Sequence, residues 1–133
     1  MSVSILREFA VIAVAGAAGA VCRYAIGLWC MRSIGGHFPW GTLTVNVVGC
    51  FLMGLTIHFG EAAKALSPLT TLALAVGFLG ALTTFSAFGV QTYSLWEHGR
   101  SAHALANIGA NLLLALLATW VGITLGRAIS PLS

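Results

Sequence analysis

The chain has 133 residues, of which 59% are hydrophobic and 7% are charged, with a formal net charge of +3. About 25% of the residues in a soluble domain are charged, so this composition excludes an ordinary water-soluble protein. Because the loops between its apolar segments are too short to form a soluble unit, we predict one all-α transmembrane domain over residues 1–133.

Four apolar segments are each long enough to cross a bilayer core, which requires about 20 helical residues. They are Phe9–Met31, Gly41–Gly60, Ala65–Trp96 and Ser101–Gly126. Arg7 and the small residues at positions 15–17 imitate a secretory signal. The apolar run continues well beyond those small residues, so we expect a membrane span here, in a multi-pass membrane protein.

The first span carries a cation, Arg23, inside its apolar run. A charged side chain at the centre of a membrane helix costs about 2.5–3.5 kcal/mol on insertion scales, so it should face protein or water rather than lipid. Two roles stay open for Arg23: it lines an anion vestibule, or it caps backbone carbonyls and extends toward the membrane surface.

The second span carries Asn46 a few residues after its start. Polar groups in hydrocarbon need partners, and an interhelical hydrogen bond is one explanation. The other is anion binding, because an Asn side chain has two N–H donors.

The third span contains the sequence "GFLGALTTFSAF" at residues 77–88. A straight helix over the uncharged residues 69–96 would be about 42 Å long at 1.5 Å per residue, which exceeds a core of about 30 Å. We therefore predict an interruption near Gly80–Thr84. Unwound carbonyls at this depth coordinate small cations in transporters, and oxygens without a carboxylate suit Na⁺ better than a divalent metal.

Phe85 and Phe88 follow this interruption at a spacing of three residues. They either pack against lipid and protein, or present the positive edges of their rings to an anion. Ring edges beside hydroxyls would form an anion path without a fixed cation, and conduction requires binding weak enough for release.

The fourth span carries Asn107 and Asn111 one helical turn apart, and therefore on one face. They either join helices or extend a line of donors past Phe85 and Phe88. Gly122 and Gly126 are spaced for close helix packing.

Positive charges are almost balanced between the two sides of the membrane. One side has Arg7, Lys64 and Arg127, and the other has Arg32, Arg100 and, if it extends that far, Arg23. Since an excess of Lys and Arg sets orientation, and neither side has a clear excess, we expect insertion in both orientations. The alternative is that a weak bias decides a single orientation. Two opposite copies would form an antiparallel homodimer, equivalent to the inverted repeats of transporters.

Three segments, "GAAGAVCRY", "GTLTVNVVGCF" and "GFLGALTTFSAF", resemble in this order the CrcB/Fluc family of fluoride channels. The resemblance covers essentially the whole chain. It implies a dual-topology antiparallel homodimer with a broken third helix, which exports toxic cytoplasmic fluoride passively through two pores. The implied partners are fluoride, membrane lipid and a second copy, with no nucleic acid.

The resemblance also implies roles for individual residues, matched motif by motif. The implied fluoride pathway contains Asn46, Phe85, Phe88, Asn107 and Asn111. A structural Na⁺ at the dimer centre would be held by the backbone carbonyls of Gly80 and Thr83, and Arg23 would be the first-span arginine. Two departures are Ala115, where some relatives have a hydroxyl, and Ala87, where Thr is frequent.

Other functions fit the sequence less well. A small dual-topology exporter of drugs or other cations needs a buried carboxylate, but Glu8, Glu61 and Glu97 lie near span ends. An enzyme is not expected, because Ser86 lies deep in a span whereas the potential acids and bases lie at the ends, which gives no triad. A purely structural subunit would leave the span asparagines without a task.

Overall fold

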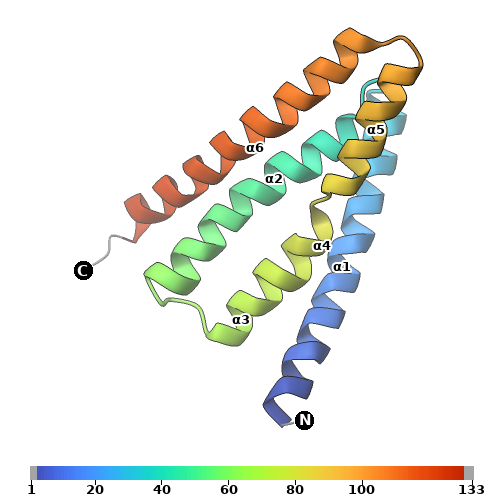
Figure 1. The fold of residues 1–133 in the computed structure, drawn as a ribbon. Helices are drawn as coiled ribbons and strands as arrows, with labels where there is room; N and C mark the ends of the chain where they lie inside the picture. Colours follow the sequence, from blue (N-terminus) through green and yellow to red (C-terminus); the bar gives the residue numbers. More distant parts are fainter. Residues whose placement is uncertain (1–2, 131–133) are drawn as a thin grey trace.

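The computed structural model describes residues 3–130, and in that range it is helical with no β-strand. The helices are α1 (Val3–Ser33), α2 (Trp40–Ile57), the π-helical η1 (His58–Ala62), α3 (Pro68–Leu72), the π-helical η2 (Ala73–Leu79), α4 (Gly80–Leu82), α5 (Phe85–Glu97) and α6 (Ser101–Ile129). Figure 1 shows them as long rods with short connections.

Four helical stretches are long and apolar enough to cross a membrane, as the sequence predicts. They are Val3–Ser33, Trp40–Ala62, Pro68–Glu97 and Ser101–Ile129. The third stretch begins three residues later than expected, because Ser67 caps its first turn and Pro68 occupies the first helical position. Proline is favoured there, because the backbone N–H that it lacks would have no partner within the helix. The protein is thus a multi-pass membrane protein.

The α2 and α6 helices run side by side over most of their length (Figure 1). Glycines at their contact allow the two backbones to approach: a Cβ atom on Gly54 would collide with the carbonyl oxygen of Thr119, and one on Gly122 with that of Phe51. The packing role predicted for Gly122 is therefore correct. In a lipid environment such close approach is a main source of helix association.

The α1 helix packs against the first half of the third span through a second set of small residues. A Cβ on Gly19 would collide with the carbonyl oxygen of Phe78, and one on Gly77 would lie 2.7 Å from the Cβ of Ala15. This contact fixes the position of the chain that leads into residues 80–84.

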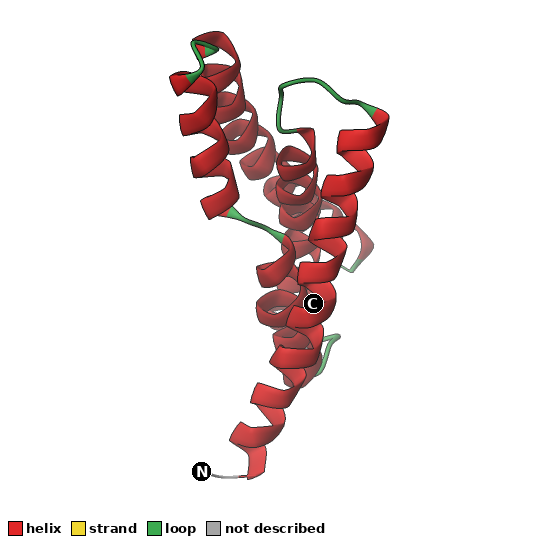
Figure 2. Ribbon diagram, turned by 90° about the vertical axis from the view of Figure 1, so that its right-hand side faces the viewer, coloured by secondary structure: helices red, strands yellow, loops and turns green. Residues whose placement is uncertain are grey.

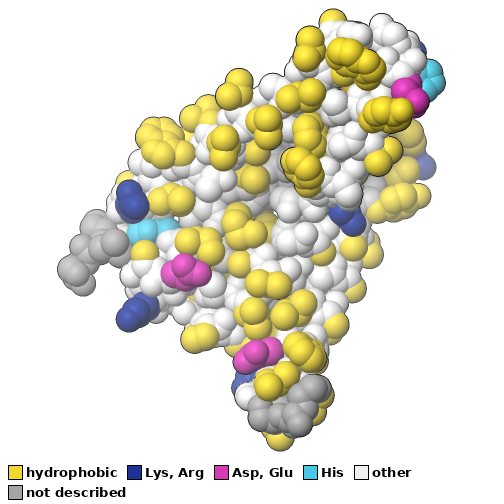
Figure 3. Space-filling view, viewed as in Figure 1, with side chains coloured by type: hydrophobic (Ala, Val, Ile, Leu, Met, Phe, Trp, Pro, Cys, Tyr) yellow, Lys and Arg dark blue, Asp and Glu magenta, His cyan; other side chains and the backbone are white. Residues whose placement is uncertain are grey.

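Hydrophobic side chains cover much of the surface in Figure 3, and most charged side chains lie toward the ends of the helices. Exposed apolar residues occur along all four spans, for example Val14, Val48, Val90 and Leu116. An apolar exterior of this kind is expected where lipid replaces water as the solvent.

Candidate functional site

The third span changes direction at Thr83 and Thr84. The α4 helix ends at Leu82, both threonines have extended backbone angles (ψ 155° and 114°), and α5 begins at Phe85. Figure 2 shows this connection about halfway along the molecule, away from the loops at the helix ends.

Several backbone carbonyls at this connection lose the amides that would bond them in a continuous α-helix, and those of Gly80 and Thr83 are among them. The N–H of Thr84 would donate to Gly80 but donates to Oδ1 of Asn46 at 2.8 Å. The N–H of Ala87 would donate to Thr83 but donates to Oγ1 of Thr84 at 3.2 Å. The carbonyl oxygens of Gly80 and Thr83 are thus acceptors without their helical donors.

Asn46 links the second span to the segment between α4 and α5 through both the oxygen and the nitrogen of its side-chain amide. Its Oδ1 accepts from the N–H of Thr84, and its Nδ2 donates to the carbonyl of Thr84 at 3.2 Å and to Oδ1 of Asn111 at 2.8 Å. Both N–H groups of Asn46 therefore have protein acceptors, which agrees with the interhelical role left open from sequence.

The three asparagines form a continuous hydrogen-bonded series. Nδ2 of Asn111 donates to Oδ1 of Asn107 at 2.9 Å and to its carbonyl at 3.1 Å. Nδ2 of Asn107 donates to Oγ1 of Thr92 at 2.8 Å, and Thr92 donates to the carbonyl of Phe88 at 2.8 Å. Asn107 and Asn111 are 0% and 5% exposed, so nearly all of this series is shielded from the surroundings.

Phe85 and Phe88 are in contact, with ring centroids 5.1 Å apart and planes tilted by 55°. Their environments differ: Phe88 is 7% exposed and Phe85 is 76% exposed. At three residues the two side chains are about 60° apart around the helix axis, so one faces the protein while the other faces outward.

A cavity of about 280 Å³ adjoins these rings and the asparagine series. Its lining includes Asn46, Thr84, Phe85, Phe88, Asn111 and Ala115. The structure thus brings together four of the five residues predicted for an anion pathway. The fifth, Asn107, lies behind Asn111 and supports it.

Arg23 lies on the other side of the connection, half-buried in α1. It lines a separate cavity of about 380 Å³ together with Tyr24, Thr42 and Thr84. Thr84 lines both cavities, so Arg23 stands beside the site without belonging to the asparagine series.

Two residues of the site were not predicted as members. Thr84 is the hydrogen-bond partner of Asn46, and Thr92 accepts from Asn107. The doublet of threonines was a signal for Thr84, because side-chain oxygens compete for backbone partners. Thr92 had a weaker signal, its spacing of four residues from Phe88.

Comparison with known proteins identifies the family of the chain. Residues 10–123 match the family described as CrcB-like protein, Camphor Resistance (CrcB). A relative from Acidobacterium capsulatum, named fluoride-specific ion channel FluC, is 42% identical over 118 residues, covering 89% of this chain and 94% of the relative. A protein of the same name from Citrifermentans bemidjiense is 39% identical, over 93% of this chain and 100% of its own length. One from Geobacter metallireducens is 43% identical, over 87% of this chain and 94% of its own length. The chain therefore belongs to the CrcB family, as its three sequence motifs indicate.

Proposed function

We propose that the protein is a fluoride-specific ion channel, and not an enzyme, which lets toxic fluoride leave the cytoplasm down its electrochemical gradient. Membership of the CrcB family and the names of its relatives support this function. The observation that carries it is the cavity in which Phe85, Phe88 and Asn46 meet. This lining has no charged side chain, so an anion would be bound weakly enough to move on.

A hydroxyl pair at the start of α5 supplies a donor for the ion. Oγ1 of Thr84 and Oγ of Ser86 are 3.3 Å apart, and one of the two hydroxyl hydrogens suffices for the bond between them. When Ser86 donates in this bond, the hydroxyl hydrogen of Thr84, which lines the cavity, is available to an anion beside the ring edges of Phe85 and Phe88, which carry partial positive charge. Asn46 and Asn111 hold the surrounding backbone, and their N–H groups are donors that an entering ion competes for.

The functional unit that we propose is an antiparallel, dual-topology homodimer with two pathways. The ring of Phe85 faces outward, and Trp96, three helical turns further along α5 on the same side, is also exposed. A second copy would cover this face and close the cavity. The nearly balanced positive charges of the two sides support insertion in both orientations. Each pathway would then use Phe85 from the interface and Phe88 from the interior.

A structural Na⁺ is part of the same proposal. The carbonyl oxygens of Gly80 and Thr83 fit such an ion, because their helical donors are diverted to Asn46 and Thr84. Among residues 3–130 no group of three His, Cys, Asp or Glu side chains is arranged for a metal, so ligands at this position would be neutral oxygens, which suit Na⁺. When bound, the ion would neutralise these carbonyl dipoles and hold the two third spans together as a broken-helix pair.

Arg23 has a supporting role in this proposal. Its cavity meets the ion cavity at Thr84, and a cation at this position raises the local concentration of anions. The alternative of a cation exporter loses support, because Glu8, Glu61 and Glu97 are all exposed at helix ends rather than buried as proton-coupled exchange requires.

Efflux from liposomes tests the function directly. Purified protein reconstituted into vesicles loaded with potassium fluoride should release fluoride when valinomycin balances the charge, as measured with a fluoride electrode. Vesicles loaded with potassium chloride at the same gradient are the control and should stay tight. Fluoride retention equal to that of protein-free vesicles, or equal release of both anions, would contradict a fluoride-specific channel.

A further inference from the structure

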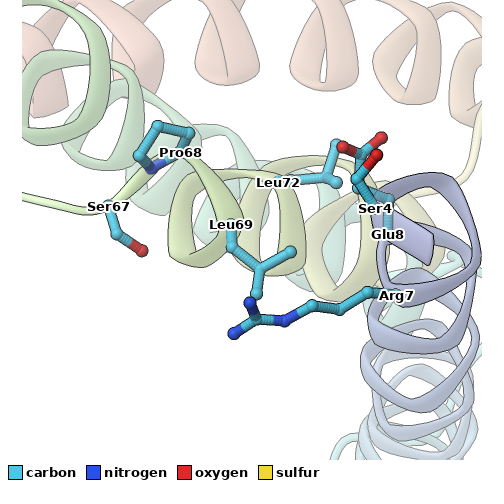
Figure 4. A pocket seen from close by; sticks show the side chains of 7 residues that line it. All are labelled: Ser4, Arg7, Glu8, Ser67, Pro68, Leu69 and Leu72. Atoms are coloured by element: carbon cyan, nitrogen blue, oxygen red, sulfur yellow. The ribbon is translucent and has the colours of Figure 1, made fainter. Parts of the chain in front are cut away.

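A third cavity, of about 610 Å³, lies between the start of α1 and the start of the third span. Arg7 and Glu8 line it from α1, and Ser67, Leu69 and Leu72 line it from the other side. Figure 4 shows Arg7 extended from α1 alongside Leu69, while Glu8 lies beside Leu72. The cavity therefore combines two opposite charges with an apolar wall, and it contains none of the residues of the proposed ion pathway.

The position of this cavity corresponds to the headgroup layer of the membrane. The α1 helix has 31 residues, so it is about 46 Å long and extends beyond a hydrocarbon core of about 30 Å. Arg7 and Glu8 are in its second turn, on the side of the membrane that also receives Glu61 and Lys64. Leu69 and Leu72 lie further along the third span, toward the hydrocarbon.

Neither charge is neutralised by another side chain that the structure describes. Arg7 and Glu8 have no hydrogen bond or ion pair within residues 3–130, and both side chains are exposed. As consecutive helical residues they do not face each other, yet both line the same cavity. A ligand that carries a negative and a positive group a few bonds apart would complement both.

We propose that this cavity binds the headgroup of phosphatidylethanolamine. The guanidinium of Arg7 donates N–H groups to the phosphate oxygens, a geometry for which Arg is well suited. The carboxylate of Glu8 accepts N–H groups from the primary ammonium, and the acyl chains lie along Leu69 and Leu72. Phosphatidylcholine offers Glu8 a positive charge but no N–H group, so it satisfies the carboxylate less well. Phosphatidylglycerol has no cation and satisfies only Arg7.

Native mass spectrometry of the delipidated full-length protein tests this site. The protein is mixed with equal amounts of phosphatidylethanolamine, phosphatidylcholine and phosphatidylglycerol, and retained lipids are counted. We expect a preference of about three- to fivefold for phosphatidylethanolamine over phosphatidylcholine, the range that exposed charge pairs support. Glu8→Gln should abolish this preference, and Arg7→Gln should reduce retention of all three lipids.

Arg127→Gln is the matched control, because Arg127 lies in the last turn of α6 on the same side of the membrane. It removes one positive charge there but leaves the cavity intact, so the lipid preference should not change. All three substitutions are at exposed positions, and unchanged thermal unfolding would show that each variant is folded. Equal retention of the two zwitterionic lipids by the unmodified protein would overturn the proposal. A preference that survives Glu8→Gln would overturn it as well.

Discussion

The backbone N–H of Thr84 donates a hydrogen bond of 2.8 Å to Oδ1 of Asn46, although the two residues are 38 positions apart. This bond replaces the helical bond to Gly80 and fixes the interruption from outside the third span. The interruption is thus held by a side chain of the second span, and the residues on either side of it are placed by the same contact. The helix geometry at this point and the proposed ion binding therefore depend on one amide group.

Substitution of Asn46 should reduce both stability and flux. Asn46→Ala leaves the N–H of Thr84 and Oδ1 of Asn111 without their partners, which costs about 1–3 kcal/mol for each buried group left unsatisfied. Fluoride efflux should fall by about tenfold or more, since a 1.4 kcal/mol increase in a barrier is tenfold in rate. Liposome efflux and thermal unfolding measure the two effects.

Two further variants complete this test. Asn46→Asp keeps an acceptor for Thr84, but its charge repels an anion and its second oxygen faces the acceptor oxygens of Thr84 and Asn111. Flux should therefore be lost, and stability should fall at least as far as in Asn46→Ala. Thr124→Ala is the control, because Thr124 is exposed and bonds only within its own helix. Wild-type efflux in Asn46→Ala would remove Asn46 from the pathway.

The two phenylalanines should differ in their effects. Phe85→Ile and Phe88→Ile should each reduce fluoride efflux, because an aliphatic side chain has no positive ring edge. Phe88→Ile should also lower the melting temperature, since Phe88 is buried and the replacement leaves space that is not refilled. Phe85→Ile should leave it nearly unchanged in the separated monomer.

Phe9→Ile is a suitable control for both, because Phe9 is an exposed phenylalanine of α1 far from the cavity. Its efflux should equal that of the unmodified protein. Crosslinking before the assay reports whether each variant still associates. Unchanged flux in both Phe85→Ile and Phe88→Ile would refute a role for the rings.

The sequence predicted the features that depend on neighbouring residues. The lengths of the apolar runs located four spans, and Thr83 and Thr84, which have extended backbone angles, lie within the Gly80–Thr84 segment that the length of the third run singled out. The motifs identified the family. The pairing of Asn46 with Thr84 and Asn111 was not predictable, because it depends on which faces of three helices meet. Likewise, the spacing of Phe85 and Phe88 did not predict that one is buried and the other exposed.

Close packing of α2 on α6 should be sensitive to a single methyl group. Gly54→Ala places a Cβ against the carbonyl oxygen of Thr119, and such overpacking typically costs about 1–3 kcal/mol. The melting temperature in detergent should therefore fall. Gly109→Ala is the matched control, because nothing lies within 4 Å of a Cβ at that position, and its melting temperature should stay equal or rise. Equal values for the two variants would contradict the observed contact.

Removal of Na⁺ should weaken the dimer without unfolding the helices. If the carbonyls of Gly80 and Thr83 hold the ion between copies, replacing Na⁺ by N-methylglucamine, which is too large for such a site, should increase the monomer fraction seen by size-exclusion chromatography. Thr83→Ala should keep this Na⁺ dependence, because the substitution removes only the side-chain bond to Leu79 and leaves the carbonyl in place. Circular dichroism should show the same helix content in both salts. A monomer fraction that does not depend on Na⁺ would argue against the ion, while the liposome assay would still test the fluoride pathway independently.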